Sequence, residues 1–265
     1  MPDYGECFRL KFIKFVHSTI LFTTMKLSNN KILITGGATG IGLGLAERFI
    51  KENNTVLVCG RRQQALDEAK AKFPGLITIQ CNLAKESERE NLFRWISEKH
   101  ADLNVLVNNA GIQNWMSLQN DDFMKKAQDE IRINVEAPLH LTQLFTKLGS
   151  LTTIMNVTSA LAFVPLIKAP VYCATKAFFH SVTLSIRELL KTKNIEVIEI
   201  IPPAINTDLG GKGIHDYAPP VGDFIEAIFV QLKEGRQELT FGYSENMVKN
   251  SQALYQTFKG MNKIE

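Results

Sequence analysis

The feature that most restricts the fold of this chain is a regular alternation of short apolar runs with longer segments of helical length. Six runs rich in β-branched residues, from KILIT to IEVIEIIPP, recur along the sequence. The runs are continuously apolar, which is typical of parallel strands that are covered on both faces. We therefore predict an α/β fold in which helices flank a single doubly wound parallel sheet of about seven strands.

The same pattern sets the expected elements and domains. The predicted strands are 31–35, 55–60, 76–81, 102–109, 151–159, 195–203 and 238–242. The predicted helices are 41–53, 62–72, 86–99, 119–148, 172–192, 221–234 and 244–260. No linker rich in Pro, Gly or Ser interrupts the chain, so we predict one catalytic domain over residues 25–265.

Residues 1–24 form an atypical N-terminal extension, in which basic and bulky apolar residues mix without clear periodicity. The segment lacks the small-residue cleavage site of a signal peptide. It also contains far fewer apolar residues than the roughly 18 to 20 that are needed to span a bilayer. Three interpretations remain: a mis-assigned start upstream of Met25, a weak membrane-surface anchor, or an extra element packed on the domain. The first is favoured, so membrane association is not expected.

Composition excludes several classes of function. The net charge of +3 comes without a basic stripe interleaved with aromatic residues, so nucleic-acid binding is not expected. The four cysteines show no C-x-x-C spacing, which favours buried thiols in a reducing compartment and a cytoplasmic protein. No metal site is expected.

A glycine-rich stretch, TGGATGIG, directly follows the first predicted strand at residues 35–42. Its glycines let the backbone turn tightly and approach a pyrophosphate, and the helix that begins near Ile41 points its amides at that charge. The alternative is a tight strand–helix turn without a ligand. The strand before and the amphipathic helix after favour a dinucleotide site, and hence a Rossmann-type sheet.

Two arginines close the second strand, in VCGRR. Dinucleotide folds that prefer NAD usually carry an acid at this place, whereas an arginine suits the 2′-phosphate of NADP. Arg61 can present a planar guanidinium to that phosphate. The alternative is that the arginines only solvate the helix start, but cations there oppose the helix dipole. We therefore predict NADP(H) as cofactor, with NAD(H) less favoured.

Five further motifs follow in order: NNAG at 108–111, Asn134 within a predicted helix, Ser159 at a strand end, Tyr172 and Lys176 thirteen and seventeen residues after it, and IPPAINT. With TGGATGIG, the set resembles the classical short-chain dehydrogenase/reductase family over residues 28–242. Within that family, CGRR, YCATKAFFHS, PPAINTDL and the short tail resemble a subgroup associated with the D-alanylation of teichoic acids.

The chemistry of the Tyr–Lys pair agrees with this resemblance. Residues four apart share a helix face, so the Lys176 ammonium can lie near the Tyr172 phenol. A free tyrosine has a pKa of about 10, and we expect the neighbouring cation to lower it toward neutral pH. The Ser159 hydroxyl can hydrogen-bond the substrate oxygen and stabilise negative charge there. Each residue alone would be an ordinary helix-surface or strand-end residue.

The resemblance implies the remaining roles. Catalysis would use Ser159, Tyr172, Lys176 and Asn134, with Lys176 also gripping the nicotinamide ribose and Asn134 holding a water that relays protons. An aspartate common in the family after the third strand is replaced here by Asn82, which can still meet adenine. The expected cofactor-binding residues are Gly36, Thr39, Gly40, Ile41, Gly42, Arg61, Asn82, Leu83, Asn109, Tyr172, Lys176, Ile205 and Thr207.

The resulting prediction is an NADP-dependent oxidoreductase that interconverts a hydroxyl and a carbonyl on a small or medium organic substrate. The alternative is a non-catalytic dinucleotide-binding regulatory or scaffold protein, which would have no reason to keep all four catalytic residues. A lyase or epimerase of the extended branch would carry T-G-x-x-G-x-x-G, a different glycine spacing.

Further expectations concern the pocket and assembly. The pocket is expected to be apolar, with Ile112, Trp115, Leu161, Phe163 and Val164, beneath a short lid, DLGGKGIHDYAPP. His180 is expected to be a packing or interface histidine rather than a second base. A homodimer or homotetramer is expected through the helices at 119–148 and 172–192.

Overall fold

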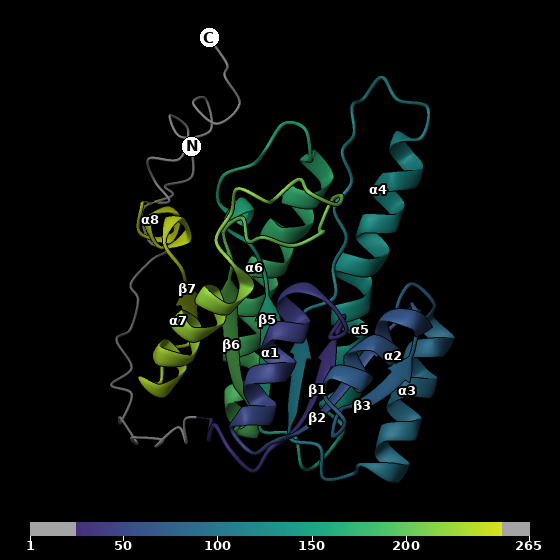
Figure 1. The fold of residues 1–265 in the computed structure, drawn as a ribbon, viewed down its shortest axis with the longest axis vertical. Helices are drawn as coiled ribbons and strands as arrows, with labels where there is room; N and C mark the ends of the chain where they lie inside the picture. Colours follow the sequence, from purple (N-terminus) through teal and green to yellow (C-terminus); the bar gives the residue numbers. More distant parts are fainter. Residues whose placement is uncertain (1–24, 251–265) are drawn as a thin grey trace, which may run out of the picture.

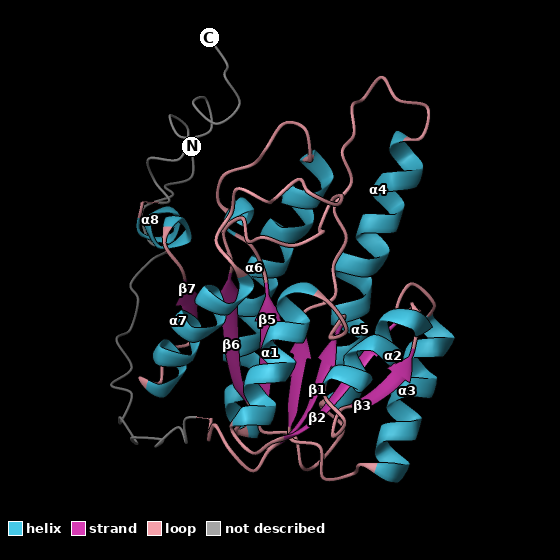
Figure 2. Cartoon of the chain, viewed as in Figure 1, coloured by secondary structure: helices cyan, strands magenta, loops and turns pink. Residues whose placement is uncertain are grey.

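The computed structural model describes residues 25–250, which form one seven-stranded sheet in the order β3-β2-β1-β4-β5-β6-β7. All six strand pairings are parallel, which confirms the predicted doubly wound sheet (Figures 1 and 2). The strands are β1 (Lys31–Thr35), β2 (Thr55–Gly60), β3 (Ile77–Gln80), β4 (Val105–Asn108), β5 (Thr153–Val157), β6 (Glu196–Ile201) and β7 (Glu238–Thr240).

Helices cover both faces of the sheet, as continuously apolar strands require. On one face, α1, α2 and α7 bury a cluster that includes Phe49, Leu66 and Phe229; on the other, α3, α5 and α6 bury a second cluster around Leu92 and Phe145 (Figure 1). The helices are α1 (Gly40–Lys51), α2 (Gln63–Lys72), α3 (Glu86–Lys99), α4 (Phe123–Ile131), α5 (Ala137–Phe145), α6 (Pro170–Leu190), α7 (Val221–Lys233) and α8 (Tyr243–Lys249).

The strand order reverses its direction between β1 and β4. From β1 the chain builds outward through β2 and β3, and it then returns to place β4 on the other side of β1, with Ile34 opposite Val107. The loops that leave β1 and β4 therefore run to opposite faces, which opens a crevice beyond the carboxyl ends of the strands.

One predicted helix is interrupted. Residues 119–148 do not form a single α-helix: α4 and α5 are joined by a π-helical turn, Arg132–Glu136, in which the Ala137 amide donates to the Arg132 carbonyl. Pro138 has no N–H and cannot donate an α-helical hydrogen bond to the carbonyl of Asn134, four residues earlier. The missing donor explains why the backbone hydrogen bonds change here from the α-helical to the wider π-helical spacing.

The other boundaries move by a few residues. Helix α6 begins at Pro170, two residues before the predicted start, since proline is favoured in the first turn of a helix. The predicted helix 244–260 is observed only as α8; residues 251–265 lie outside the described residues, as does the N-terminal extension 1–24. Over residues 25–250, no helix has the length and apolar character needed to cross a bilayer.

The contact between α1 and α7 provides a test of this packing. Phe49 and Phe229 are fully buried and meet edge to face, with ring centroids 4.9 Å apart. Phe49→Ala should lower the free energy of unfolding by about 3–5 kcal/mol, because it leaves a cavity in the core. Urea denaturation of both proteins measures this difference in the free energy of unfolding.

Val230→Ala serves as the control, since this side chain on α7 is exposed and its truncation should change the unfolding free energy by less than about 0.5 kcal/mol. A loss as small in Phe49→Ala would contradict the described packing.

Candidate active site

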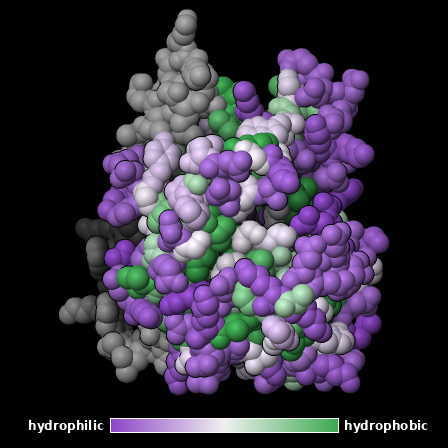
Figure 3. Space-filling view, viewed as in Figure 1, coloured by the Kyte–Doolittle hydropathy of each residue, from purple (hydrophilic) through white to green (hydrophobic). Residues whose placement is uncertain are grey.

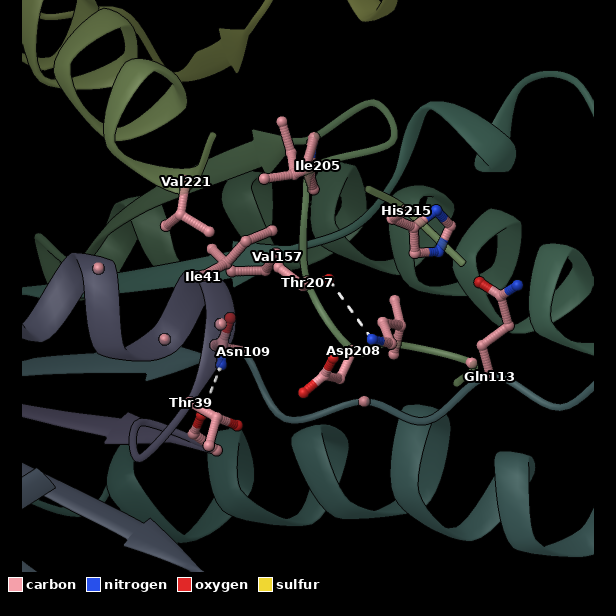
Figure 4. A pocket seen from close by; sticks show the side chains of 18 of the residues that line it. Thr39, Ile41, Asn109, Gln113, Val157, Ile205, Thr207, Asp208, His215 and Val221 are labelled. Atoms are coloured by element: carbon pink, nitrogen blue, oxygen red, sulfur yellow. Dashed lines mark hydrogen bonds between the residues drawn. The ribbon is translucent and has the colours of Figure 1, made fainter. Parts of the chain in front are cut away.

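A single large cleft runs across the carboxyl edge of the sheet, with a volume of about 2110 Å³. Small-molecule pockets usually measure roughly 300–1,000 Å³, so this cleft has room for a dinucleotide together with a second molecule. Thr39, Ile41 and Asn109 lie at one end of it and Gln113 and His215 at the other (Figure 4). Figure 3 shows one face of the molecule in a space-filling view, where apolar side chains gather in the middle and polar side chains surround them.

The glycine-rich loop forms one wall of the cleft. Gly36 and Gly40 have φ angles of 63° and 54°, the left-handed region that glycine adopts without strain. A Cβ on Gly42 would lie 2.4 Å from the Gly36 carbonyl oxygen, so only glycine fits there. The loop then enters α1, whose first amides face the cleft from Gly40 onward.

Asn109 holds this loop from behind. Its side-chain amide donates to the Thr35 carbonyl at 2.8 Å and to the Gly36 carbonyl at 3.2 Å, and its backbone amide donates to the Thr35 hydroxyl at 3.0 Å. Asn109 was predicted to bind the cofactor; it lines the cleft, and its side chain also fixes the end of β1 to the end of β4.

The two arginines after β2 lie at the end of the cleft that the glycine-rich loop forms. Arg61 and Arg62 are exposed and line the cleft, and an Arg62 Nη2 donates to the Thr39 hydroxyl at 3.5 Å. A side pocket beside them is also lined by Asn82 and Glu88. Two guanidinium groups beside a glycine loop and an open pocket fit a dinucleotide that carries an extra phosphate on this side.

The other predicted cofactor residues reach the same cleft from distant parts of the chain. Leu83 and Ile205 are buried cleft residues, and Asn82 lines the cleft while its Oδ1 accepts from the Ala84 amide at 3.1 Å. A Cβ built on Gly40 would lie 3.3 Å from the Thr207 methyl carbon, so the segment after β6 closes over the glycine loop.

The three reactive side chains come together on one wall of the cleft. Ser159 follows β5, while Tyr172 and Lys176 share one face of α6; all three are buried and line the cleft. The Lys176 Nζ lies 5.7 Å from the centre of the Tyr172 ring and donates to the Val157 carbonyl at 2.9 Å. The Ser159 hydroxyl accepts from the Leu161 amide at 3.0 Å.

Burial controls the charges of this group. It raises the pKa of the Tyr172 phenol above its usual range, while a hydrogen bond with Ser159 acts in the opposite direction. Burial also lowers the pKa of Lys176 to about 8. The expectation that the pKa of Tyr172 is lowered toward neutral pH is therefore wrong for this structure, because desolvation of the phenol is the largest effect on its pKa and raises it.

Asn134 lies in the π-helical turn and is buried beside α6. Its Oδ1 accepts from the Ile112 amide at 2.9 Å, and its Nδ2 donates to the Ile112 carbonyl at 2.9 Å and to the Thr175 hydroxyl at 3.1 Å. A Cβ on Gly111 would lie 3.4 Å from the Asn134 Oδ1 and 3.5 Å from the Lys176 Nζ. Asn134 therefore ties the loop after β4 to α6, next to the lysine.

A buried carboxyl near Tyr172 was missed by the sequence analysis. Glu130 is fully buried on α4; one of its oxygens accepts from the Asn114 amide, and the other has no hydrogen-bond partner among the described residues. Burial raises the pKa of Glu130 to about 7. Its position four residues before Asn134, on the same helix face, was the one indication that the sequence offered.

The end of the cleft beyond Tyr172 is mainly apolar. Trp115, Leu161, Leu166 and Leu209 pack around the tyrosine, and the Trp115 indole donates to the Gly210 carbonyl at 2.9 Å. Ile112, Trp115 and Leu161 line the cleft as predicted.

Two predicted pocket residues lie elsewhere. Phe163 packs against His180 with tilted rings whose centroids are 4.6 Å apart, and Val164 is buried against Met247. Neither lines the cleft, because the 3₁₀ turn after Ser159 directs this stretch toward α6 and α8. His180, expected to be a packing residue, also pairs with buried Glu199.

Comparison with known proteins decides the family. A family model described as short chain dehydrogenase matches residues 30–217. The chain belongs to the short-chain dehydrogenase/reductase family. It is 41% identical over 256 residues to the "uncharacterized oxidoreductase DltE" of Bacillus subtilis, which covers 91% of this chain and 100% of the relative. The chain is thus an oxidoreductase of the short-chain type; the pathway implied by the subgroup resemblance stays a prediction.

Solved structures share the fold. A short chain dehydrogenase from Burkholderia cenocepacia in complex with NADP superimposes with a TM-score of 0.76 at 23% identity, over 88% of this chain and 99% of that one. A short chain dehydrogenase/reductase from Burkholderia phymatum in complex with NAD gives a TM-score of 0.74 at 14% identity, over 90% and 97%. These structures share the fold of this chain, and both NADP and NAD are bound on that fold.

The buried lysine gives a pH prediction. Because burial lowers the pKa of Lys176 from 10.5 to about 8, the folded chain binds fewer protons than the unfolded chain between these values. The lysine therefore opposes folding most below pH 8, and its penalty falls as the pH rises toward 10.5. NMR of the lysine side chains in the cofactor-free protein should show one resonance with a midpoint near pH 8.

That resonance is assigned by its loss in Lys176→Met, which should also remove this rise of the unfolding free energy with pH. A Lys176 midpoint near the free value of about 10.4 would contradict the described burial.

Proposed function

We propose that the protein is an NADP-dependent oxidoreductase that interconverts a hydroxyl and a carbonyl on a small or medium organic molecule. The observation that carries this proposal is the burial of Ser159, Tyr172 and Lys176 together on the wall of a dinucleotide-sized cleft. Burying an amine and a phenol beside each other costs free energy, and such costs concentrate where side chains perform chemistry.

The roles follow from the protonation states. Tyr172 stays protonated at neutral pH because burial raises its pKa, so it is ready to donate a proton to a carbonyl oxygen during reduction. In the oxidation direction the phenol must first pass its proton to another base, and its phenolate then accepts the proton of the substrate hydroxyl. The Ser159 hydroxyl stabilises the same oxygen as negative charge develops on it. Bound NADPH supplies the hydride, and the side chains orient the substrate and move its proton.

Lys176 and Asn134 complete the proton path. With a pKa of about 8, Lys176 can take up and release a proton near neutral pH. The Asn134 side chain is occupied by Ile112 and Thr175, whereas Pro138 leaves its main-chain carbonyl without an α-helical donor. We assign the binding of a proton-relaying water to that carbonyl.

NADP is preferred over NAD in this proposal. Arg61 and Arg62 lie where the ribose 2′-phosphate of NADP is expected, and the described part of α2 has no acid in its first turn. The solved relatives with NADP and with NAD share only the fold with this chain, so the preference rests on the arginines.

A non-catalytic scaffold remains the alternative, and the buried phenol of Tyr172 argues against it. A protein that only binds a dinucleotide could use Lys176 to hold a ribose, but it has no use for a buried phenol beside that amine and the Ser159 hydroxyl. An apolar residue at position 172 would avoid the cost of burying the phenol.

The remaining features of the proposal concern the substrate, the assembly and the compartment. The apolar walls around Tyr172 suit a substrate with an apolar body. Apolar side chains left exposed on α4 and α6 support a homodimer or homotetramer through these helices: Met124, Ile131, Phe178, Leu184 and Leu189. Cys59, Cys81 and Cys173 are free and buried, which suits the reducing cytoplasm.

The tyrosine is tested by a single oxygen deletion. Tyr172→Phe should lower kcat at least about 100-fold, because the proton donor is lost, while NADPH binding changes little. A panel of alcohols with NADP and of carbonyl compounds with NADPH, followed by NADPH absorbance, first identifies a substrate. Full activity in Tyr172→Phe would overturn the mechanism, and no turnover of any compound by the wild-type protein would favour the scaffold alternative.

The arginine is tested by cofactor affinity. Arg61→Ala should weaken NADPH binding about tenfold or more and leave NADH binding unchanged, since a charge-assisted contact to a phosphate is worth about 1.5–3 kcal/mol. Fluorescence titration measures both affinities. Arg236→Ala, an exposed arginine beyond α7, is the control, and an unchanged NADPH preference in Arg61→Ala would sink the 2′-phosphate assignment.

A further inference from the structure

A negatively charged side chain is buried in the sheet directly below the reactive residues. Glu199 lies in β6 with no exposed surface, on the face covered by α6. The His180 Nδ1 lies 2.9 and 3.0 Å from its two carboxylate oxygens. His180 is on α6, one helical turn beyond Lys176. The pair therefore joins the helix that carries the reactive tyrosine to β6, the strand between β5 and β7.

The same pair contacts the chain on both sides of Ser159. The Thr158 hydroxyl donates to the Glu199 Oε1 at 2.6 Å, and Thr158 immediately precedes the reactive serine. Phe163, which follows the short turn after the serine, packs against the His180 ring with the ring centroids 4.6 Å apart and the ring planes tilted by 56°. Thr158 before Ser159 and Phe163 after it therefore both contact the pair formed by Glu199 and His180.

The charges explain why the pair is stable as an ion pair. A buried carboxylate is costly unless it is paired and hydrogen-bonded. The hydrogen bond with Glu199 raises the pKa of His180, opposed by burial; Glu238 adds to the rise, and Arg187 opposes it. Among the described residues these are the charged groups that act on His180 from α6, β6 and β7, and their sum favours the charged imidazolium.

We propose that Glu199 and His180 are positioning residues that hold Ser159 in its reactive place, through Thr158 on one side and Phe163 on the other. The inference builds on the proposed function, in which Ser159 contacts the substrate oxygen. It adds to that function a supporting contact in the third turn of α6, one turn beyond Lys176.

A pH dependence follows from the charges. As the pH rises through the raised pKa of His180, the histidine loses its proton and leaves Glu199 buried without a counter-charge. The hold on Thr158 then weakens, and kcat should fall on the alkaline side. Glu199→Gln keeps an oxygen that accepts from Thr158 and removes the charge. The part of the alkaline fall that comes from His180 should therefore disappear, the part that comes from Lys176 should remain, and kcat near neutral pH should stay within about threefold of the wild type.

Two matched substitutions test the positioning. Thr158→Val removes the hydroxyl that Glu199 holds and keeps the shape of the side chain. Thr183→Val is the control: its hydroxyl accepts from the Asn156 amide at 3.0 Å, another buried contact between the sheet and α6, but it touches nothing next to Ser159. The Thr158 hydroxyl also lies 3.3 Å from the Ile200 carbonyl, and the Thr183 hydroxyl donates to the Phe179 carbonyl at 2.7 Å. Each variant therefore loses two buried hydrogen bonds, so they should lose similar stability.

Hydrogen exchange gives a readout that does not need a substrate. The Leu161 amide donates to the Ser159 hydroxyl, and the Ala160 amide donates to the Pro202 carbonyl at 2.9 Å. In Thr158→Val we expect the amides of residues 160–162 to exchange at least about tenfold faster than in the wild type, and in Thr183→Val we expect no change there. With a substrate from the panel, Thr158→Val should lower kcat about tenfold and leave NADPH affinity unchanged, whereas Thr183→Val should not lower kcat.

The outcomes separate this inference from the proposed function. Unchanged exchange at 160–162 in Thr158→Val, or an equal change in Thr183→Val, overturns the positioning role, whatever the enzyme turns over. Faster exchange in Thr158→Val with no turnover by the wild-type protein supports the role of the pair in holding this segment and rejects the oxidoreductase proposal.

Discussion

The fold and the site both depend on how helix α6 is attached to the sheet. Helices that cover a parallel sheet usually pack through apolar side chains, yet α6 also places polar ones against it. Lys176 donates to the Val157 carbonyl, Asn156 donates to Thr183, and Arg187 donates to the Val197 carbonyl. Together with His180, these contacts recur at each turn of the helix. A directional contact at each turn fixes the rotation of α6, which apolar packing alone would leave less specific.

The rotation of α6 decides the chemistry. Tyr172 and Lys176 reach the cleft only because the turns that follow them are fixed on β5 and β6. The cost is high, since an amine, a phenol and a carboxylate are all taken out of water. The rest of the domain supplies the stability that tolerates this cost, through two apolar clusters on the faces of the sheet.

The nucleotide end of the cleft is built on a different principle. That end contains glycines instead of buried charged side chains. The glycines at 36, 40 and 42 leave room for a ligand close to the backbone, and Asn109 after β4 hydrogen-bonds the end of β1. The arginines that follow β2 are exposed and free to meet a phosphate. A backbone cradle binds any dinucleotide, so the choice between NADP and NAD is left to side chains at its rim.

The order of amino acids was sufficient for the sheet, its parallel strands and the family, because hydrophobic periodicity and closely spaced motifs are local properties. The sequence also predicted that Ser159, Tyr172 and Lys176 share one site, because a residue at a strand end and two residues one helical turn apart have predictable positions. The π-helical turn at Asn134, the buried Glu130 and the pairing of Glu199 with His180 were not predictable in this way. They depend on which distant residues pack against each other and on how much water that packing excludes, and the same exclusion of water reversed the expected pKa shift of Tyr172.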